Sequence, residues 1–242
     1  SYPRILRTVR SIRTRLFLGL EVVDIDPDGR ERFGNSAVYV DPERGIIGRY
    51  DKIKLVPFAE KIPGPDFVRK IVASYIGRPG KVLPDFSEGR EQTIFEAGGV
   101  PFGAANCYEV VYPDFSCNVA RKGGRFLVHI SNEGWFRDSA ELDQMLAICR
   151  FRAIESRMSI VRGTNTGISA FIEPTGRVVA EVKGKEVQGV LDGRIRVTTG
   201  GSLYRKVGDI LAWLAVAAVV SGMVLHFWLT RKNGPPIVAG LR

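Results

Sequence analysis

The chain is poor in the residues that bind metals or form disulfide bonds. Its 242 residues include only 3 Cys and 2 His, and the sequence contains no CxxC pair. An odd number of cysteines argues against a disulfide framework, and no cysteine has the neighbouring histidine of a zinc site. The motifs GxGxxG and GxxxxGK[ST], which bind nucleotide phosphates, are also absent. We therefore expect no metal and no cofactor.

Disorder and fibrous structure are excluded by composition. Hydrophobic residues form 45% of the chain and charged residues 25%, which is typical of a globular domain large enough to bury a core. Lys and Arg outnumber Asp and Glu by 35 to 26, giving a net charge of +9. Anionic lipid, nucleic acid and acidic substrates are all compatible with this charge. Nucleic acid fits least, because no recognition motif or basic-aromatic stripe is present.

No charged residue interrupts the hydrophobic run Ile210–Leu229. About 20 residues at 1.5 Å per residue reach the roughly 30 Å of a bilayer core. Trp213 and Trp228 lie near the two ends of the run, where aromatic residues favour the membrane interface, and Arg231 and Lys232 follow it. A buried core helix is the alternative, but the length of the run favours a membrane span.

No signal peptide is predicted at the start of the chain, because no apolar segment and cleavage site follow the first basic residues. Its first residue is Ser1 rather than an initiator Met, and we expect residues 1–15 to be weakly structured. The chain is therefore interpreted as a fragment whose upstream part has been lost.

Strands alternating with helices predict a layered α/β domain. We expect an amphipathic helix at 139–157, capped by Asp138 or Ser139, and a second helix at 110–122. Residues 61–91 are interpreted as a long loop with a short helix near 67–75. Strands are expected at 16–24, 36–40, 45–48, 92–96, 100–106, 125–131, 160–162, 168–173, 178–182 and 189–195.

Cys107 stands where the apolar run VPFGAAN ends and the next element begins. This pattern places a thiol at a tight strand-to-helix turn, where a nucleophile is exposed above the edge of a sheet. Backbone N–H groups at the start of a helix favour a thiolate and face the position of an oxyanion. A cysteine after a strand, taken alone, is more often a small core residue.

Five short motifs follow one another along the chain: GRYDKIKLVPFAE (48–60), NCYE (106–109), NEGWF (132–136), RAIE (152–155) and RGTNTGIS (162–169). In this order and spacing they resemble the nitrilase or carbon-nitrogen hydrolase superfamily. Within it, YDKxxLVPFxExxP, CYE and NxxWF, followed by a terminal apolar span, are similar to the apolipoprotein N-acyltransferase family, which completes bacterial lipoprotein acylation. The resemblance covers roughly Leu16 to Leu229.

The resemblance implies an αββα sandwich, incomplete at its N-terminus, in residues 1–205. A transmembrane helix at 206–230 and a short basic tail at 231–242 would follow. The family is found in the bacterial inner membrane, so the catalytic domain would face the periplasm.

The resemblance also implies roles for single residues. Cys107 matches the nucleophile, which takes an acyl group from a phospholipid as a thioester. Lys52 matches the lysine that stabilises the oxyanion, and Glu60 matches a second essential carboxylate that orients Lys52. Tyr108 and Glu109 match residues that flank the nucleophile and shape the substrate site.

Other interpretations of these residues stay open. Lys52 is also compatible with a solvated loop lysine, and Glu60 with a carboxylate at the start of a helix. Trp135 and Phe136 are interpreted either as acyl-chain contacts or as ordinary core aromatics. Four polar residues of the later motifs are interpreted as structural: Glu155, Arg157, Arg162 and Asn165.

One part of the family pattern is missing. The catalytic base of the family is a Glu on an earlier strand, which would here precede Ser1. The chain then carries two members of a Glu-Lys-Cys triad, and we expect little or no turnover from this polypeptide alone.

Three functions are compatible with these observations. The first is N-acyl transfer from a phospholipid to the amino group of a diacylglyceryl-cysteine apolipoprotein. The second is a membrane-tethered nitrilase-type amidase, with water as the acceptor. The third is a non-catalytic nitrilase-like module that only binds lipid or lipoprotein at the membrane.

Overall fold

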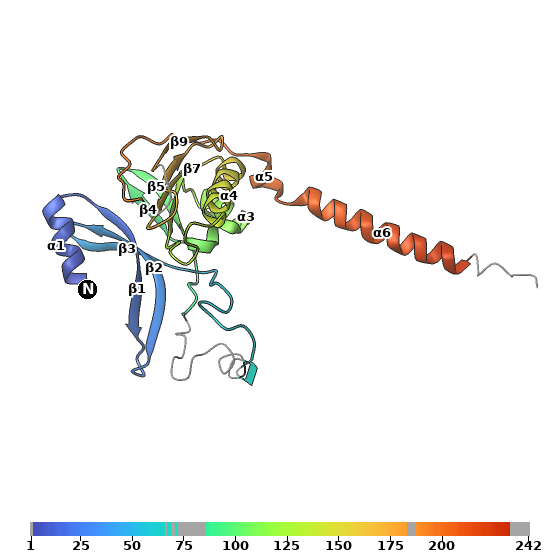
Figure 1. The fold of residues 1–242 in the computed structure, drawn as a ribbon, viewed down its shortest axis with the longest axis horizontal. Helices are drawn as coiled ribbons and strands as arrows, with labels where there is room; N and C mark the ends of the chain where they lie inside the picture. The colour runs from blue at the N-terminus through green and yellow to red at the C-terminus, as the bar shows by residue number, and fades with distance from the viewer. Residues whose placement is uncertain (1, 66, 69–70, 72–85, 183–186, 233–242) are drawn as a thin grey trace, which may run out of the picture. The chain divides into compact units, whose positions relative to one another are not determined.

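The structure is a computed structural model that describes residues 2–65, 67–68, 71, 86–182 and 187–232. The chain divides into two compact units, Ser1–Ser202 and Leu203–Arg242. The first unit holds two β-sheets and the helices that cover them, and the second holds the long helix α6 (Figure 1). The short helix expected near 67–75 lies largely outside the described residues.

The smaller sheet is antiparallel, in the order β1-β2-β3, with β1 (Leu16–Ile25), β2 (Glu31–Asp41) and β3 (Gly45–Asp51). Alternate residues of β2 face opposite sides of this sheet. Ala37 and Tyr39 belong to the core between the sheets, and Val38 and Val40 belong to a second apolar cluster. Both faces of the small sheet are therefore covered.

The second cluster is completed by a helix at the start of the chain, α1 (Tyr2–Ile12), whose Val9 is fully buried. The expectation of a weakly structured N-terminus is therefore wrong. Ile5, Leu6 and Val9 form an apolar face that packs on the outer side of the small sheet. Tertiary packing stabilises this helix, since isolated helices of its length are marginal in water.

The larger sheet has the order β4-β5-β6-β7-β8-β9. Its central strands β5, β6 and β7 are parallel, and the outer pairs are antiparallel. The expected strand at 189–195 is not formed. The six strands are β4 (Ile94–Ala97), β5 (Val100–Asn106), β6 (Phe126–Ser131), β7 (Ser159–Thr164), β8 (Ala170–Ile172) and β9 (Val178–Glu181).

Aromatic side chains join the two sheets. Phe102 of β5 lies 5.5 Å from Phe17 and 5.6 Å from Tyr39, both on the small sheet, between ring centroids. Phe95 makes a similar contact with Phe17 at 5.1 Å. This edge-to-face cluster forms the apolar layer between the sheets.

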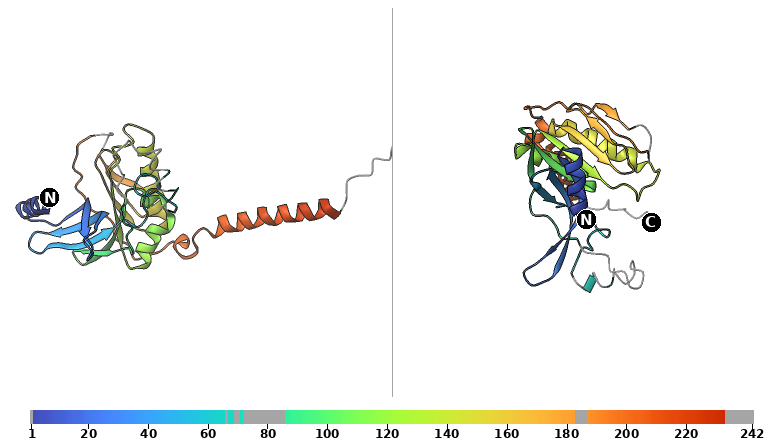
Figure 2. Two further views of the ribbon diagram at one scale, coloured as in Figure 1. Left: turned by 90° about the horizontal axis from the view of Figure 1, so that it is seen from below. Right: turned by 90° about the vertical axis from the view of Figure 1, so that its left-hand side faces the viewer.

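Helices α3 (Pro113–Arg121) and α4 (Glu141–Ser156) complete the first unit and contribute buried residues to the main core. Figure 2 shows them along the larger sheet, which gives the predicted αββα order. The helix expected at 110–122 is divided in two: a 3₁₀ turn, η1 (Cys107–Val111), precedes α3, and Pro113 begins α3. Helix α4 begins after Ala140, and the Ser139 hydroxyl accepts a hydrogen bond of 3.4 Å from the N–H of Glu141, its first residue.

The second unit contains the short helix α5 (Leu203–Val207) and α6 (Ile210–Lys232). Helix α6 includes the whole predicted run, has a mean hydropathy of 2.2 over its most apolar window, and buries none of that window. It is long and apolar enough to span a membrane. A core helix would be buried, so this alternative is not supported.

Gly103 brings β5 close to α3. A Cβ at this position would lie 2.4 and 2.6 Å from the two γ-carbons of Val119. We expect Gly103→Ala to lower the free energy of unfolding by about 1–3 kcal/mol, the usual cost of overpacking. Chemical denaturation of the whole chain in detergent measures this loss.

Gly163→Ala is the matched control for this prediction. Gly163 also lies in a strand of the larger sheet, but a Cβ there would meet no atom within 4 Å. The control should change stability by less than about 0.5 kcal/mol. Equal losses in the two variants would contradict close packing at Gly103.

Candidate active site

Cys107 lies at the predicted strand-to-helix turn. It follows the last residue of β5 and begins η1, and its side chain is half-buried. Its φ of 54° falls in the left-handed region, which non-glycine residues adopt rarely. Backbone strain of this kind concentrates at functional sites, so the turn is a candidate position for a nucleophile.

Lys52 and Glu60 form an ion pair next to β3. Lys52 Nζ lies 2.7 and 2.9 Å from the two carboxylate oxygens of Glu60, and Lys52 is fully buried. Glu60 also accepts a bond of 2.7 Å from the backbone N–H of Val56. These contacts exclude a solvated loop lysine, and they place Glu60 where it orients the ammonium group.

Two asparagines connect this ion pair to the cysteine turn. The Asn35 amide donates to Glu60 Oε1 at 2.7 Å, and the Asn106 amide donates to Asn35 Oδ1 at 2.7 Å. The backbone N–H of Lys52 donates to the carbonyl oxygen of Asn35 at 2.8 Å. Asn106 directly precedes Cys107, so a continuous polar chain joins the thiol-bearing turn to the Lys52 ammonium. Sequence analysis missed Asn35, which has no local signal inside its strand.

Glu109 fastens the same two segments together from a fully buried position. One carboxylate oxygen accepts from Tyr50 Oη at 2.6 Å and from the N–H groups of Ile53 and Lys54 at 2.7 and 3.0 Å. The other oxygen accepts from the N–H of Asn106 at 2.9 Å. Burial raises the pKa of Glu109, and the hydrogen bonds to it act in the opposite direction. Glu109 therefore holds the Lys52 loop against the cysteine turn.

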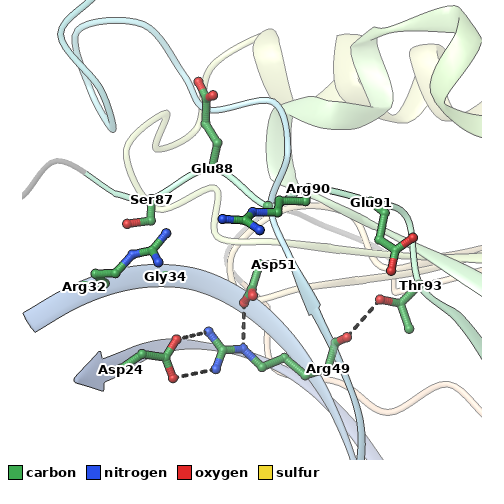
Figure 3. A pocket seen from close by; sticks show the side chains of 11 residues that line it. Asp24, Arg32, Gly34, Arg49, Asp51, Ser87, Glu88, Arg90, Glu91 and Thr93 are labelled. Atoms are coloured by element: carbon green, nitrogen blue, oxygen red, sulfur yellow. Dashed lines mark hydrogen bonds and ion pairs between the residues drawn. The ribbon is translucent and has the colours of Figure 1, made fainter. Parts of the chain in front are cut away.

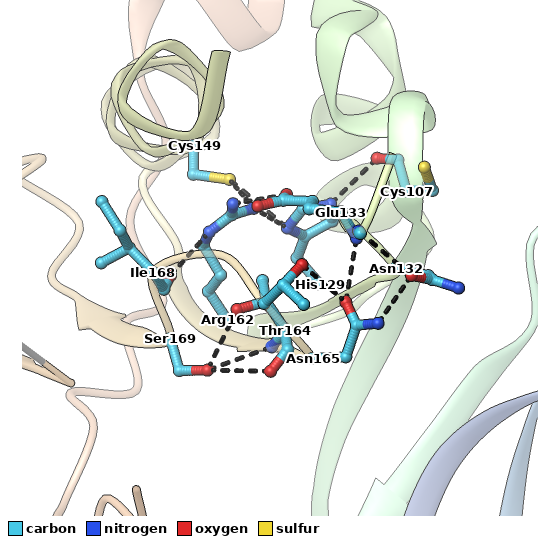
Figure 4. A network of polar contacts seen from close by, with 12 residues as sticks. Cys107, His129, Asn132, Glu133, Cys149, Arg162, Thr164, Asn165, Ile168 and Ser169 are labelled. Carbon is cyan, nitrogen blue, oxygen red and sulfur yellow. Dashed lines mark hydrogen bonds and ion pairs between the residues drawn. The ribbon is translucent and has the colours of Figure 1, made fainter. Parts of the chain in front are cut away.

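A second buried network reaches Cys107 from the other side (Figure 4). His129 Nε2 lies 2.9 Å from the Cys107 carbonyl oxygen, and Arg162 Nη1 lies 2.8 Å from His129 Nδ1. Arg162 Nη2 pairs with Glu133 Oε1 at 2.5 Å. Sequence analysis interpreted Arg162 as structural, and overlooked both His129 and Glu133.

His129 is not placed to act as a general base. Burial, followed by the charge of Arg162, lowers the pKa of His129 to about 3, and Lys52 acts in the same direction. The ring is therefore neutral at physiological pH, and both of its nitrogens already have polar partners. Within the described ranges, no hydrogen bond is made to Cys107 Sγ. A proton acceptor for the thiol is thus not among the contacts of this part of the chain.

The predicted aromatic contacts lie at the surface. Trp135 is 86% exposed, Phe136 39% and Tyr108 38%. The interpretation of Trp135 and Phe136 as core aromatics is therefore wrong. The Tyr108 ring meets that of Tyr112 edge to face, with 6.1 Å between centroids. These exposed rings are available to an apolar ligand.

A cavity of about 460 Å³ lies at the end of the small sheet (Figure 3). Arg49 crosses it and binds Asp24 through two contacts of 2.6 and 2.8 Å and Asp51 through one of 2.7 Å. Cys107, Lys52 and Glu60 do not line this cavity. Gly89 lines it and donates its N–H to the Lys52 carbonyl oxygen at 2.8 Å. The cavity therefore borders the backbone that carries Lys52, and its ion pairs stabilise that segment.

The described part of the chain contains no group of three or more His, Cys, Asp and Glu side chains placed to hold a metal ion. Its polar contacts instead connect the turn that carries the Cys107 thiol to the Lys52 ammonium group through Asn106, Asn35 and Glu60. Such a set fits acyl transfer through a covalent intermediate.

The layered fold and the cysteine turn define a class of protein. The chain belongs to the carbon-nitrogen hydrolase family, which matches residues 16–205. Solved structures share the fold: an amidase from Nesterenkonia sp. gives a TM-score of 0.56 at 18% identity, covering 78% of this chain and 63% of the amidase. A mutant of this amidase, described as a member of the nitrilase superfamily, gives a TM-score of 0.54 at 18% identity, covering 74% of this chain and 62% of that one.

Two curated relatives narrow the comparison to one enzyme name within this family. The chain is 35% identical over 227 residues to apolipoprotein N-acyltransferase of Geobacter metallireducens, covering 93% of this chain and 42% of the relative. It is 34% identical over 212 residues to the protein of the same name from Rhodopseudomonas palustris, covering 86% and 38%. The predicted resemblance is confirmed, and the chain spans about two fifths of the length of these relatives.

The buried His129 predicts a pH-dependent stability. Its pKa rises from about 3 in the folded chain to the ordinary 6.5 on unfolding, so the unfolded chain binds the extra proton between these values. Stability therefore falls as the pH decreases through this range, by at most about 1.4 kcal/mol per pH unit. We expect His129→Gln to reduce the loss of unfolding free energy between pH 7 and 5.5 by about 1 kcal/mol.

Denaturation of both proteins at several pH values measures this difference. Contributions from other titrating groups, such as Glu109, are common to both proteins and cancel. The same pH slope in the wild type and the variant would show that His129 is not held neutral.

Proposed function

We propose that this chain carries the acyl-transfer site of an apolipoprotein N-acyltransferase. The acyl chain of a phospholipid would pass to Cys107 as a thioester and then to the amino group of a diacylglyceryl-cysteine apolipoprotein. The observation that carries this proposal is the polar chain from Cys107 through Asn106, Asn35 and Glu60 to the buried Lys52 ammonium. The similarity to relatives of that name supports it.

Each half-reaction balances without a cofactor. In the first, the Cys107 thiol loses its proton and attacks the ester carbonyl, a C–S bond forms and the ester C–O bond breaks, and the lysophospholipid alkoxide leaves with the proton that the thiol lost. In the second, the amine attacks the thioester, a C–N bond forms and the C–S bond breaks. The amine proton returns to the sulfur.

Lys52 is the proposed electrostatic catalyst of both steps. Each tetrahedral intermediate carries a negative oxygen, which a fixed ammonium group stabilises strongly in a site from which water is excluded. The ion pair with Glu60 fixes the position of Lys52 Nζ before the substrate arrives. The N–H groups at the start of η1 supply further donors.

The exposed aromatics suit a lipid substrate. Trp135 and Phe136 follow the end of β6, and Tyr108 follows Cys107 in the chain. Large exposed aromatic groups prefer the membrane interface. We propose that Tyr108, Trp135 and Phe136 contact the acyl chain and that Glu109 shapes the substrate site by holding the Cys107 turn in place.

The proposed location is the bacterial inner membrane, with the catalytic domain facing the periplasm. Helix α6 would anchor the chain, and the net charge of +9 suits a domain next to anionic headgroups. The reaction requires the domain to lie close to the membrane, because both proposed substrates carry acyl chains.

A non-catalytic lipid-binding module is the second candidate. It is favoured by the absence, among the described residues, of a hydrogen bond between a proton acceptor and Cys107 Sγ. A membrane-tethered amidase would use water as the acceptor and an amide rather than an ester as the acyl donor. The next two experiments separate these functions.

A thioester trap tests Cys107 and Lys52 directly. We expect p-nitrophenyl palmitate to acylate Cys107 of the whole chain in detergent, since its leaving group departs without a proton donor. Lys52→Met should slow acylation about 100-fold, comparable with the loss of an oxyanion donor. Mass spectrometry of the peptide that contains Cys107 measures the adduct.

Lys54→Met is the matched control, because Lys54 is exposed and lies over the Tyr112 ring at 5.7 Å rather than at the ion pair. It should acylate at the wild-type rate. An adduct that forms equally fast in both lysine variants would exclude Lys52 as the oxyanion partner. No adduct in any variant would favour the non-catalytic module.

Turnover with a natural acyl donor tests which group accepts the acyl chain and whether a general base activates Cys107. We expect the 242-residue chain to transfer little acyl group from phosphatidylethanolamine to a diacylglyceryl-cysteine peptide, with Cys107→Ala as the blank. The reason is the lack of a general base among the contacts of Cys107. Robust Cys107-dependent transfer would show that the base has been missed, and release of free fatty acid alone would show that water, not the peptide amine, is the acceptor.

A further inference from the structure

We infer that the buried chain Glu133–Arg162–His129 is a positioning device, which holds the carbonyl group of Cys107 and thereby fixes the reactive turn. The inference rests on the proposed function in one respect, namely that Cys107 is the nucleophile. Its three members come from the larger sheet and the loop that follows β6. All three are at most 2% exposed.

The chemistry of the side chains fixes which atom donates and which accepts at each contact of the Glu133–Arg162–His129 network. Arg162 has only donors, so its contact with His129 Nδ1 requires that nitrogen to be unprotonated. The ring proton then resides on Nε2, which donates to the Cys107 carbonyl oxygen at 2.9 Å. Arg162 thus selects the tautomer of His129 that can bind the turn.

Arg162 is itself fixed at three points. It donates to Glu133 Oε1 at 2.5 Å, to His129 Nδ1 at 2.8 Å and to the Ile168 carbonyl oxygen at 2.9 Å. The Glu133–Arg162 ion pair leaves no room for a side chain at position 167, because a Cβ at Gly167 would lie 1.8 Å from Glu133 Oε2. The loop between β7 and β8 therefore closes directly on the ion pair.

The energetic cost of this arrangement argues for a role. A buried ion pair is weak evidence for stability, because desolvation offsets most of its attraction. Here Arg162 of the ion pair also donates to Nδ1 of the neutral His129 ring. Nε2 of the same ring donates to the carbonyl oxygen of the strained residue Cys107. Buried polar groups of this kind can specify one local geometry rather than add stability.

The device acts on the sulfur through the backbone. The left-handed conformation of Cys107 is sparsely populated and persists only where its surroundings hold it. Without the His129 bond, we expect the turn to relax towards negative φ, so that the side chain of Cys107 leaves the position in which the turn holds it. The thiol would lose the access that the strained turn gives it and would react more slowly.

The test is the alkylation rate of Cys107 with iodoacetamide in the whole chain in detergent, followed by peptide mass spectrometry. His129→Leu removes both hydrogen bonds and should slow alkylation at least fivefold. His129→Gln can donate to the Cys107 carbonyl and accept from Arg162, and should stay within twofold of the wild type. Rescue by Gln distinguishes positioning from a simple loss of packing.

Cys117 supplies an internal control, because it is fully buried and becomes reactive only when the domain opens. Cys149 does not serve here, because its sulfur contacts His129 and Arg162 directly. Ser156→Ala is the matched destabilising control. It removes a buried hydrogen bond of 2.6 Å to the Arg152 carbonyl oxygen. It should leave the alkylation of Cys107 unchanged.

Two results would overturn the inference. One is a wild-type rate in His129→Leu with Cys117 still protected. The other is an equally slow rate in His129→Gln. If His129→Leu exposes Cys117, His129→Asn replaces it, since its shorter amide cannot reach both partners. His129→Asn should react at least fivefold more slowly than His129→Gln, and equal rates would refute the device.

This experiment does not depend on acyl transfer. A chain that forms no thioester yet shows the expected alkylation pattern would keep the positioning device and refute the proposed function. A chain that forms the thioester and shows no effect of His129→Leu would keep the proposed function and refute the positioning device.

Discussion

The site depends on one buried ion pair, that of Lys52 and Glu60. An ammonium group that is fully removed from water needs a close counter-charge, and Glu60 supplies it through both oxygens. The remaining polar contacts of the region fix the two ends of this pair. Asn35 connects Glu60 to the residue before Cys107, and Glu109 fastens the backbone after Lys52 to the same turn. The position of the cation relative to the thiol is therefore set before any substrate binds.

Much of this arrangement could be predicted from local sequence. The apolar run before Cys107 predicted β5 and the turn, because a buried strand must end where polar residues begin. The uncharged run after Asp209 predicted α6, since its length and hydropathy are properties of the segment alone. The motif around Lys52 and Glu60 indicated a site by resemblance, and the structure shows the two side chains in contact.

What could not be predicted depends on contacts between distant segments. His129 looks like any residue of an apolar strand, and only the parallel register of β6 and β7 places it opposite Arg162. Helix α1 has little intrinsic stability and forms because the small sheet offers an apolar face. The segment 189–195 has alternating residues but no strand, since alternation does not provide a partner edge. Trp135 and Phe136 are exposed because their loop leaves the sheet, which residue type alone does not reveal.

The two halves of the site come from different sheets. Lys52 follows the last strand of the small sheet, whereas Cys107 follows a strand of the large one. The packing of Phe17 and Tyr39 on Phe102 decides whether these sheets close against each other. A partly assembled domain would therefore hold a thiol without its cation, so the aromatic layer couples the proposed reactivity of Cys107 to complete folding.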